Sequence, residues 1–169
     1  MRKIILIFTF LTIATNIFYG QIIDMHMHSY TEKDFWVGTA RNGLESSKTA
    51  KETLEETIQK MNEHNIEYAV VSGSIESLEL YTKTDKRFIP GYKNSKEDLI
   101  PIKQFEEYII SGKIKVLGEV MAVYKGKTLA DSIYQPYLAV CEKYGVPVGY
   151  HSGGIFPKCT TVRMAKLQN

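Results

Sequence analysis

The stretch QIIDMHMHSYTEK occupies residues 21–33 and holds two of the four histidines in the chain. Its apolar start, residues 22–25, predicts a short strand, and His26 and His28 follow at the end of that strand. Because side chains alternate across a strand, residues two apart share a face. We therefore expect the two imidazoles to point the same way. Neutral imidazole nitrogens are the commonest protein ligands of divalent metals, so this pair is a candidate half of a metal site.

The residues between and before the two histidines are assigned to the two faces of the predicted strand by the same alternation. Met25 and Met27 alternate with the histidines and are expected to face covering helices. Asp24 shares the histidine face and lies behind the pair.

Strand and helix patterns then alternate along the chain. Strands are expected at residues 68–72, 87–89, 116–121 and 146–150, and helices at 49–64, 102–111 and 136–144. Asn65 and Gly145 suit left-handed helix ends, and Pro90-Gly91 is expected to close the third strand. This alternation predicts βαβ units and a parallel sheet.

Chemistry in parallel α/β folds gathers at the carboxyl ends of the strands. His26 and His28 close the first strand, Glu119 lies near the end of the fourth, and His151 follows the fifth. Glu119 stands within the apolar run KVLGEVMA, and a buried carboxylate is costly unless a cation or hydrogen bonds compensate it. The fourth histidine, His64, falls at a helix end, where the helix dipole favours it, and we interpret it as structural.

The succession IIDMHMHS, MNEHNIEYAVVSG, VLGEVM and YGVPVGYHSGG resembles the amidohydrolase superfamily, in its amidohydrolase-related branch, over about residues 21–154. The resemblance implies an α/β fold of the TIM type, a parallel (β/α)8 barrel with a divalent metal, usually zinc, at its carboxyl-terminal mouth. His26 and His28 match the first-strand ligands, His151 matches the fifth-strand ligand, and Glu119 matches the strand-four carboxylate that some members use. Asp24 matches a supporting residue behind the ligands.

The activity implied by this resemblance is metal-dependent hydrolysis of a C–N, ester or similar bond in a small molecule. A bound zinc-class ion lowers the pKa of water to about 7 and polarises the scissile carbonyl. Trp36 and Arg41 in the first loop are candidate substrate contacts, although packing of that loop onto the barrel explains them equally well.

The sequence departs from the family pattern in its last part. The family also uses an aspartate after strand eight and often a histidine on strand six, and a complete barrel takes about 250 residues. Residues 160–169, TTVRMAKLQN, show no recognisable sixth strand. We therefore expect residues 21–169 to form only about the first five βα units, with no identifiable catalytic acid or base and with weak or no activity.

Several other functions remain open or are excluded by motif. A metal-dependent decarboxylase of the same branch, and a domain that has kept the sheet and lost the chemistry, both stay as alternatives. A polymerase-and-histidinol-phosphatase-type phosphoesterase would continue with an aspartate–glycine pair and a further histidine, which YTEKDF and VVSGS do not supply. A phosphate-binding loop at GKT, residues 126–128, would need glycine where Met121 stands.

Residues 1–20 have the pattern of a secretory signal peptide, with Arg2 and Lys3 before an apolar run. Cleavage after Gly20 predicts a secreted or periplasmic protein without a stable membrane span. It would lower the basic count from 21 to 19 against 19 acidic residues, and a neutral chain without a basic tract argues against nucleic acid as a partner. Cys141 is expected to be a small buried residue, and Cys141 and Cys159 do not form a disulfide framework.

Overall fold

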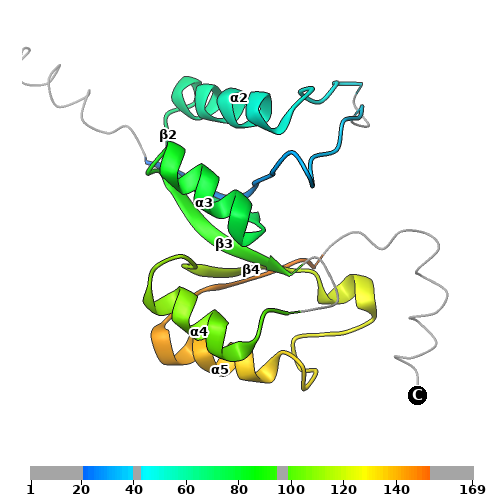
Figure 1. Cartoon of the computed structure of the whole chain (residues 1–169), viewed down its shortest axis with the longest axis vertical. Coiled ribbons are helices and arrows are strands. Elements are labelled where there is room, and N and C mark those ends of the chain that lie inside the picture. Colours follow the sequence, from blue (N-terminus) through cyan, green and yellow to red (C-terminus); the bar gives the residue numbers. More distant parts are fainter. Residues whose placement is uncertain (1–20, 40–42, 95–98, 153–169) are drawn as a thin grey trace, which may run out of the picture.

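A computed structural model describes residues 21–39, 43–94 and 99–152 of the chain (Figure 1). Its strands are β1 Ile22–His28, β2 Ile66–Gly73, β3 Phe88–Asn94, β4 Val116–Val120 and β5 Val148–Tyr150. Its helices are α2 Ala50–Glu63, α3 Ile75–Thr84, α4 Ile102–Ile110 and α5 Gln135–Tyr144, with a short 3₁₀ turn, η1, at Ala122–Lys125.

The five strands form one sheet in the order β1-β2-β3-β4-β5, and every neighbouring pair is parallel. The predicted α/β class and parallel sheet are therefore confirmed. The strands are in sequential order because each crossover connection returns the chain to the start of the adjacent strand. Within the described residues β1 and β5 are the edge strands, so both ends of the sheet have an unpaired edge.

Helix α2 follows the expected pattern closely. The Thr49 side chain accepts a hydrogen bond from the Glu52 backbone N–H and so caps the first turn. Leu54 and Met61, seven residues apart on one helix face, are buried. His64 is the C-terminal cap, and Asn65 has a φ of 54°, so the predicted helix end is confirmed.

Helix α3 was not expected from the sequence. The Ser74 side chain accepts from the Ser77 backbone N–H at its start, and Leu78 and Tyr81 bury one face three residues apart. Ser74 immediately after a strand, followed by this spacing, is the signal that would have predicted the helix.

Strand β3 is longer than expected, and the prediction that Pro90-Gly91 closes it is wrong. Both residues lie inside the strand and pair with β2. The Pro90 carbonyl still accepts a hydrogen bond from the Lys115 N–H, so the missing proline donor does not interrupt the pairing with β4. A Cβ on Gly91 would lie 2.9 Å from the Gly118 carbonyl oxygen, so the strand approaches β4 too closely there for a larger residue.

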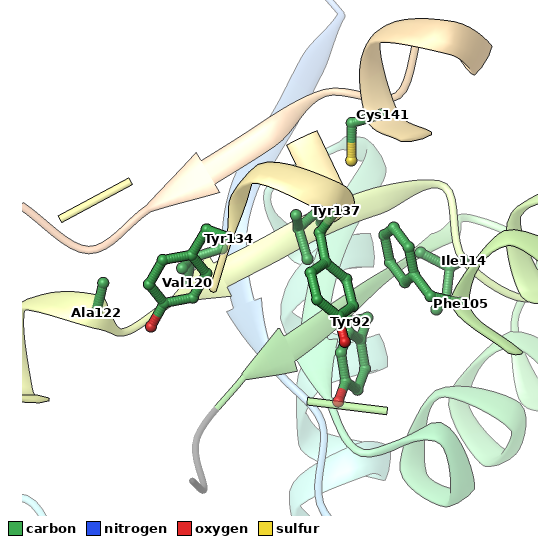
Figure 2. Close-up of a cluster of buried hydrophobic side chains, with 9 residues drawn as sticks. Tyr92, Phe105, Ile114, Val120, Ala122, Tyr134, Tyr137 and Cys141 are labelled. Carbon is green, nitrogen blue, oxygen red and sulfur yellow. The ribbon is translucent and has the colours of Figure 1, made fainter. Parts of the chain in front are cut away.

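Two apolar clusters hold the helices on the sheet. One joins α2 and α3 to β2 and β3 through buried side chains that include Leu54, Leu78 and Val71. The other joins α4 and α5 to β3 and β4, and the Phe105 ring packs near those of Tyr92 and Tyr137 at centroid distances of 6.2 and 5.3 Å (Figure 2).

Cys141 lies in the second cluster with 2% of its surface exposed, so its predicted burial is confirmed. Cys159, the proposed signal peptide at residues 1–20 and the segment 160–169 lie outside the described residues. Among the helices that the structure describes, none is both long enough and apolar enough to cross a bilayer.

Candidate metal centre

Three of the predicted site residues come together at the carboxyl ends of the strands. His26 and His28 of β1 and Glu119 of β4 each offer one ligand atom, and these atoms all lie within 4.8 Å of one another. The two imidazole rings meet edge to face with centroids 4.8 Å apart. Residues 91 positions apart in the chain therefore converge because parallel strands end at the same rim of the sheet.

An irregularity in β1 shapes the histidine pair. Asp24 pairs with Ala69 and Met27 with Val71, so β1 has one extra residue relative to β2 between these two pairs, which is a β-bulge. The Asp24 carboxylate accepts a hydrogen bond from the His26 backbone N–H at 2.8 Å, which stabilises this bulge. Asp24 thus acts on the backbone that carries an imidazole.

The same irregularity changes the position of one methionine. Met27 packs against the α2–α3 cluster as expected. Met25 does not face a helix: it is 66% exposed and lines a cavity together with His26 and Glu119. The prediction for Met25 is wrong because strict alternation of side chains fails where a strand carries an extra residue.

The carboxylate comes from the most deeply buried part of the site. Glu119 is 6% exposed, and the register of β4 against β5 shifts between Leu117 and Val120. Gly118 and Gly149 approach closely beside it, since a Cβ on Gly118 would lie 3.0 Å from the Gly149 Cα. Both glycines line the cavity of about 210 Å³ that contains His26 and Glu119.

His151, the remaining predicted ligand, is a neighbour of this group and not one of its three members. Its Nδ1 is hydrogen-bonded to the Glu119 carboxylate, and its Nε2 is 2.9 Å from the Tyr124 hydroxyl. Its backbone N–H donates to the Val120 carbonyl, which ties it to the end of β4. Both ring nitrogens are therefore occupied by hydrogen bonds, and His151 orients the carboxylate in this arrangement.

The site favours an ionised carboxylate. Burial would raise the pKa of Glu119, but the hydrogen bond and charge of His151, together with His26 and His28, outweigh burial and lower it. Glu119 is therefore negative at neutral pH.

His28 is held in its neutral form. Burial, followed by the charge of Lys93 and the neighbouring His26 imidazole, lowers the pKa of His28, while Glu119 and the Ser72 backbone act in the opposite direction. A neutral imidazole has a free lone pair for a cation.

The hydrogen bonding of His28 shows whether these residues suit a metal. Nδ1 of His28 is buried and has no hydrogen-bond partner among the described residues. A buried polar atom without a partner is rare and costs free energy. An imidazole with an unpaired nitrogen, grouped with a second imidazole and an anionic carboxylate, offers the donor types of a divalent ion such as zinc, so the residues fit.

Of the two candidate substrate contacts in the first loop, Trp36 and Arg41, the structure describes only Trp36. Trp36 is 74% exposed, and its ring lies over Gly38, where a Cβ would come within 2.0 Å of the ring. Arg41 lies outside the described residues. Sequence reasoning missed Tyr124 and Lys93, which act on His151 and His28. Tyr124 lies just after β4 and Lys93 near the end of β3, and these positions at the carboxyl ends of strands could have identified both residues as neighbours of the site.

Comparisons with known proteins bear on the fold. Neither a scan of protein-family models nor a search of curated proteins gave a match. Among solved structures, the chain is similar to a probable 2-pyrone-4,6-dicarboxylic acid hydrolase from Acinetobacter baumannii, crystallised with citric acid bound. The TM-score is 0.54 at 18% identity, over 89% of this chain and 55% of that one. The chain thus spans about half the length of that hydrolase, and the likeness concerns the fold.

Proposed function

We propose that this chain forms the first five βα units of a TIM-type barrel and supplies the metal-binding side of a hydrolase active site. The observation that carries the proposal is the convergence of His26, His28 and Glu119 within 4.8 Å at the carboxyl ends of two strands. The sequential parallel order of the strands and the likeness to part of a hydrolase support the barrel.

Zinc is the ion that we propose for the site. Two imidazole nitrogens and one carboxylate oxygen, with a fourth position open, match the ligand set of catalytic zinc. Tetrahedral zinc at these bond lengths holds its ligands about 3.4 Å apart. Because the three donor atoms lie no more than 4.8 Å apart, the widest pair needs to close by about 1.4 Å at most, which side-chain rotation can provide.

The chain's own residues have distinct roles in this proposal. His26, His28 and Glu119 hold the ion, Asp24 fixes the backbone of His26, and His151 holds the carboxylate in place. When bound, the ion supplies Lewis acidity and a lowered pKa for water, which is the chemistry of C–N and ester hydrolysis. The cavity lined by Met25, Gly149 and Tyr150 is the candidate entrance for a small-molecule substrate.

Metal binding is the first test. The metal-depleted chain is titrated with zinc by calorimetry, alongside the variants His26→Ala and His28→Ala and the control His64→Ala. We expect one site of high affinity that each of the first two substitutions removes and the third leaves intact, since His64 caps α2 just before the start of β2, at the opposite end of the strands from His28. Equal affinities in all four proteins would refute the metal site.

Hydrolysis is tested separately. The zinc-loaded chain is assayed on a panel of aryl esters, amides and lactones, with zinc-treated His28→Ala as the blank. A low turnover that depends on His28 supports the hydrolase. Release of carbon dioxide from aromatic acids without ester or amide cleavage would assign the decarboxylase instead. Absence of a zinc site tighter than that of an ordinary surface histidine pair, together with absence of both reactions, would support the domain that has lost its chemistry.

Export of the protein is a further part of the proposal and rests on residues 1–20 alone. Expression in a bacterial host with fractionation of periplasm and medium, followed by intact mass measurement, tests it. A mature chain that begins at Gln21 is expected, and a full-length mass in the cytoplasm would contradict export.

A further inference from the structure

A second cavity opens at the opposite end of the sheet from the metal-site residues. It has a volume of about 480 Å³ and lies among the end of α3, the starts of β3 and β4, and the turn after α4. Phe88 and Pro90, both buried, line it at the start of β3. The metal-site residues lie at the carboxyl ends of β1 and β4, so the two sites are at opposite ends of the strands.

The charge of this groove is strongly positive. Lys83, Lys86, Lys113 and Lys115 line it, and Glu79 is its one carboxylate, which leaves a net charge of +3 on the lining. The whole chain has a net charge of only +2 over 169 residues. The groove therefore concentrates positive charge that the rest of the chain balances with acidic residues.

The ion pairs within the groove leave part of this charge uncompensated. Glu79 accepts from Lys113 at 2.8 Å and lies 3.6 Å from Lys83, so one carboxylate serves two ammonium groups. Lys86 donates to the Thr82 carbonyl at 3.2 Å, which satisfies a donor without neutralising its charge. Lys115 forms no ion pair with the carboxylates that the structure describes. Four ammonium groups thus surround a concave surface with a single counter-charge.

We propose that this groove binds a small anion that carries a diphosphate group. A volume of about 480 Å³ lies within the range of small-molecule sites and suits a compact ligand better than a flat membrane surface. Lysine ammonium groups bind phosphate as point charges, and a diphosphate carries several negative charges at neutral pH, comparable with the surplus on the lining. Phe88 and Pro90, both buried, supply the apolar part of the lining, so the lysine ammonium groups are the groups that a ligand would contact.

Inorganic pyrophosphate is the probe, titrated into the metal-depleted chain by calorimetry at low ionic strength. The test variant is Lys86→Gln/Lys115→Gln. The control variant Lys48→Gln/Lys51→Gln removes the same charge from the exposed start of α2, which lies outside the groove. We expect saturable binding at one site, about tenfold weaker in the test variant and unchanged within about twofold in the control. Orthophosphate is expected to bind more weakly than pyrophosphate.

A second measurement uses the unmodified sequence and does not depend on how the variants fold. Lysine acetylation is followed by mass spectrometry with and without pyrophosphate, and protection is expected at Lys83, Lys86, Lys113 and Lys115 but not at Lys51. Equal weakening in both variants, or no selective protection, would show only a general charge effect and would overturn the proposal. Because no metal is present in either measurement, the result is independent of the proposed hydrolase.

Discussion

Nδ1 of His151 is hydrogen-bonded to the carboxylate of Glu119, and this contact joins the end of β5 to the deepest residue of the candidate metal centre. The contact divides the predicted ligands into two kinds. His26, His28 and Glu119 converge on one another, whereas His151 contacts only the carboxylate of that group. Substitutions at Glu119 and His151 therefore distinguish a residue that holds the ion from one that positions a ligand.

Replacing Glu119 by Gln removes the negative charge and keeps the size of the side chain. Because a carboxylate ligand is lost, we expect the affinity for zinc to fall by at least about 100-fold, the upper end of the effect of a supporting residue. Glu107→Gln on the exposed face of α4 is the matched control and leaves the affinity unchanged. Calorimetric titration of both variants measures this. An equal affinity in Glu119→Gln and Glu107→Gln would remove Glu119 from the ligand set.

His151→Ala tests whether His151 positions Glu119 or binds the ion. Loss of the hydrogen bond to the carboxylate is expected to weaken zinc binding by about 10- to 100-fold, less than His28→Ala does. His151→Gln keeps a donor that can reach the carboxylate and should recover part of the affinity. If His151→Ala is as damaging as His28→Ala and Gln gives no recovery, His151 is itself a ligand, as the family resemblance implies.

The second apolar cluster gives a test of the fold that is independent of the metal. Phe105 has no exposed surface and packs against Tyr92 and Tyr137 (Figure 2). Phe105→Ala should lower the free energy of unfolding by about 3–5 kcal/mol, because a large cavity is left in the core. Ile110→Ala in the same helix removes a side chain that is 66% exposed and should change it by less than about 0.5 kcal/mol. Urea denaturation followed by circular dichroism distinguishes the two, and similar losses in both would mean that α4 does not pack as described.

The sequence predicted the parallel sheet and the convergence of two β1 histidines with Glu119, because strand ends and side-chain alternation are local properties. It did not predict the position of Met25, since a bulge is set by the pairing of β1 with β2 and not by β1 alone. The sequence pattern also predicted that β3 ends at Pro90-Gly91. Pairing with β2 on one side and β4 on the other continues the strand through these residues. Tyr124 was missed because its contact with His151 depends on how η1 folds over the end of β4.

Burial of Cys141 predicts slow thiol chemistry in the native protein. Burial raises the pKa of this thiol from its ordinary value of 9 to about 11, so at pH 8 the thiolate fraction is about 100-fold smaller than for an exposed thiol. In a Cys159→Ser background, alkylation by iodoacetamide at pH 8 should therefore be at least about 100-fold slower in the native protein than in guanidinium chloride. Mass spectrometry of samples quenched over time measures both rates.

The same shift predicts the direction of a pH effect on stability. Between pH 9 and about 11 the unfolded chain releases the Cys141 proton and the native chain retains it, so the native state binds more protons and its stability falls as pH rises. Below pH 9 both states are protonated and the full contribution is present. Cys141→Ala, compared in the Cys159→Ser background by urea denaturation at pH 8 and pH 10, should lose less stability over this interval than the parent. Rapid alkylation of the native protein, or an identical pH dependence in Cys141→Ala, would show that the thiol is accessible and that the Cys141 face of α5 is not packed in the second apolar cluster.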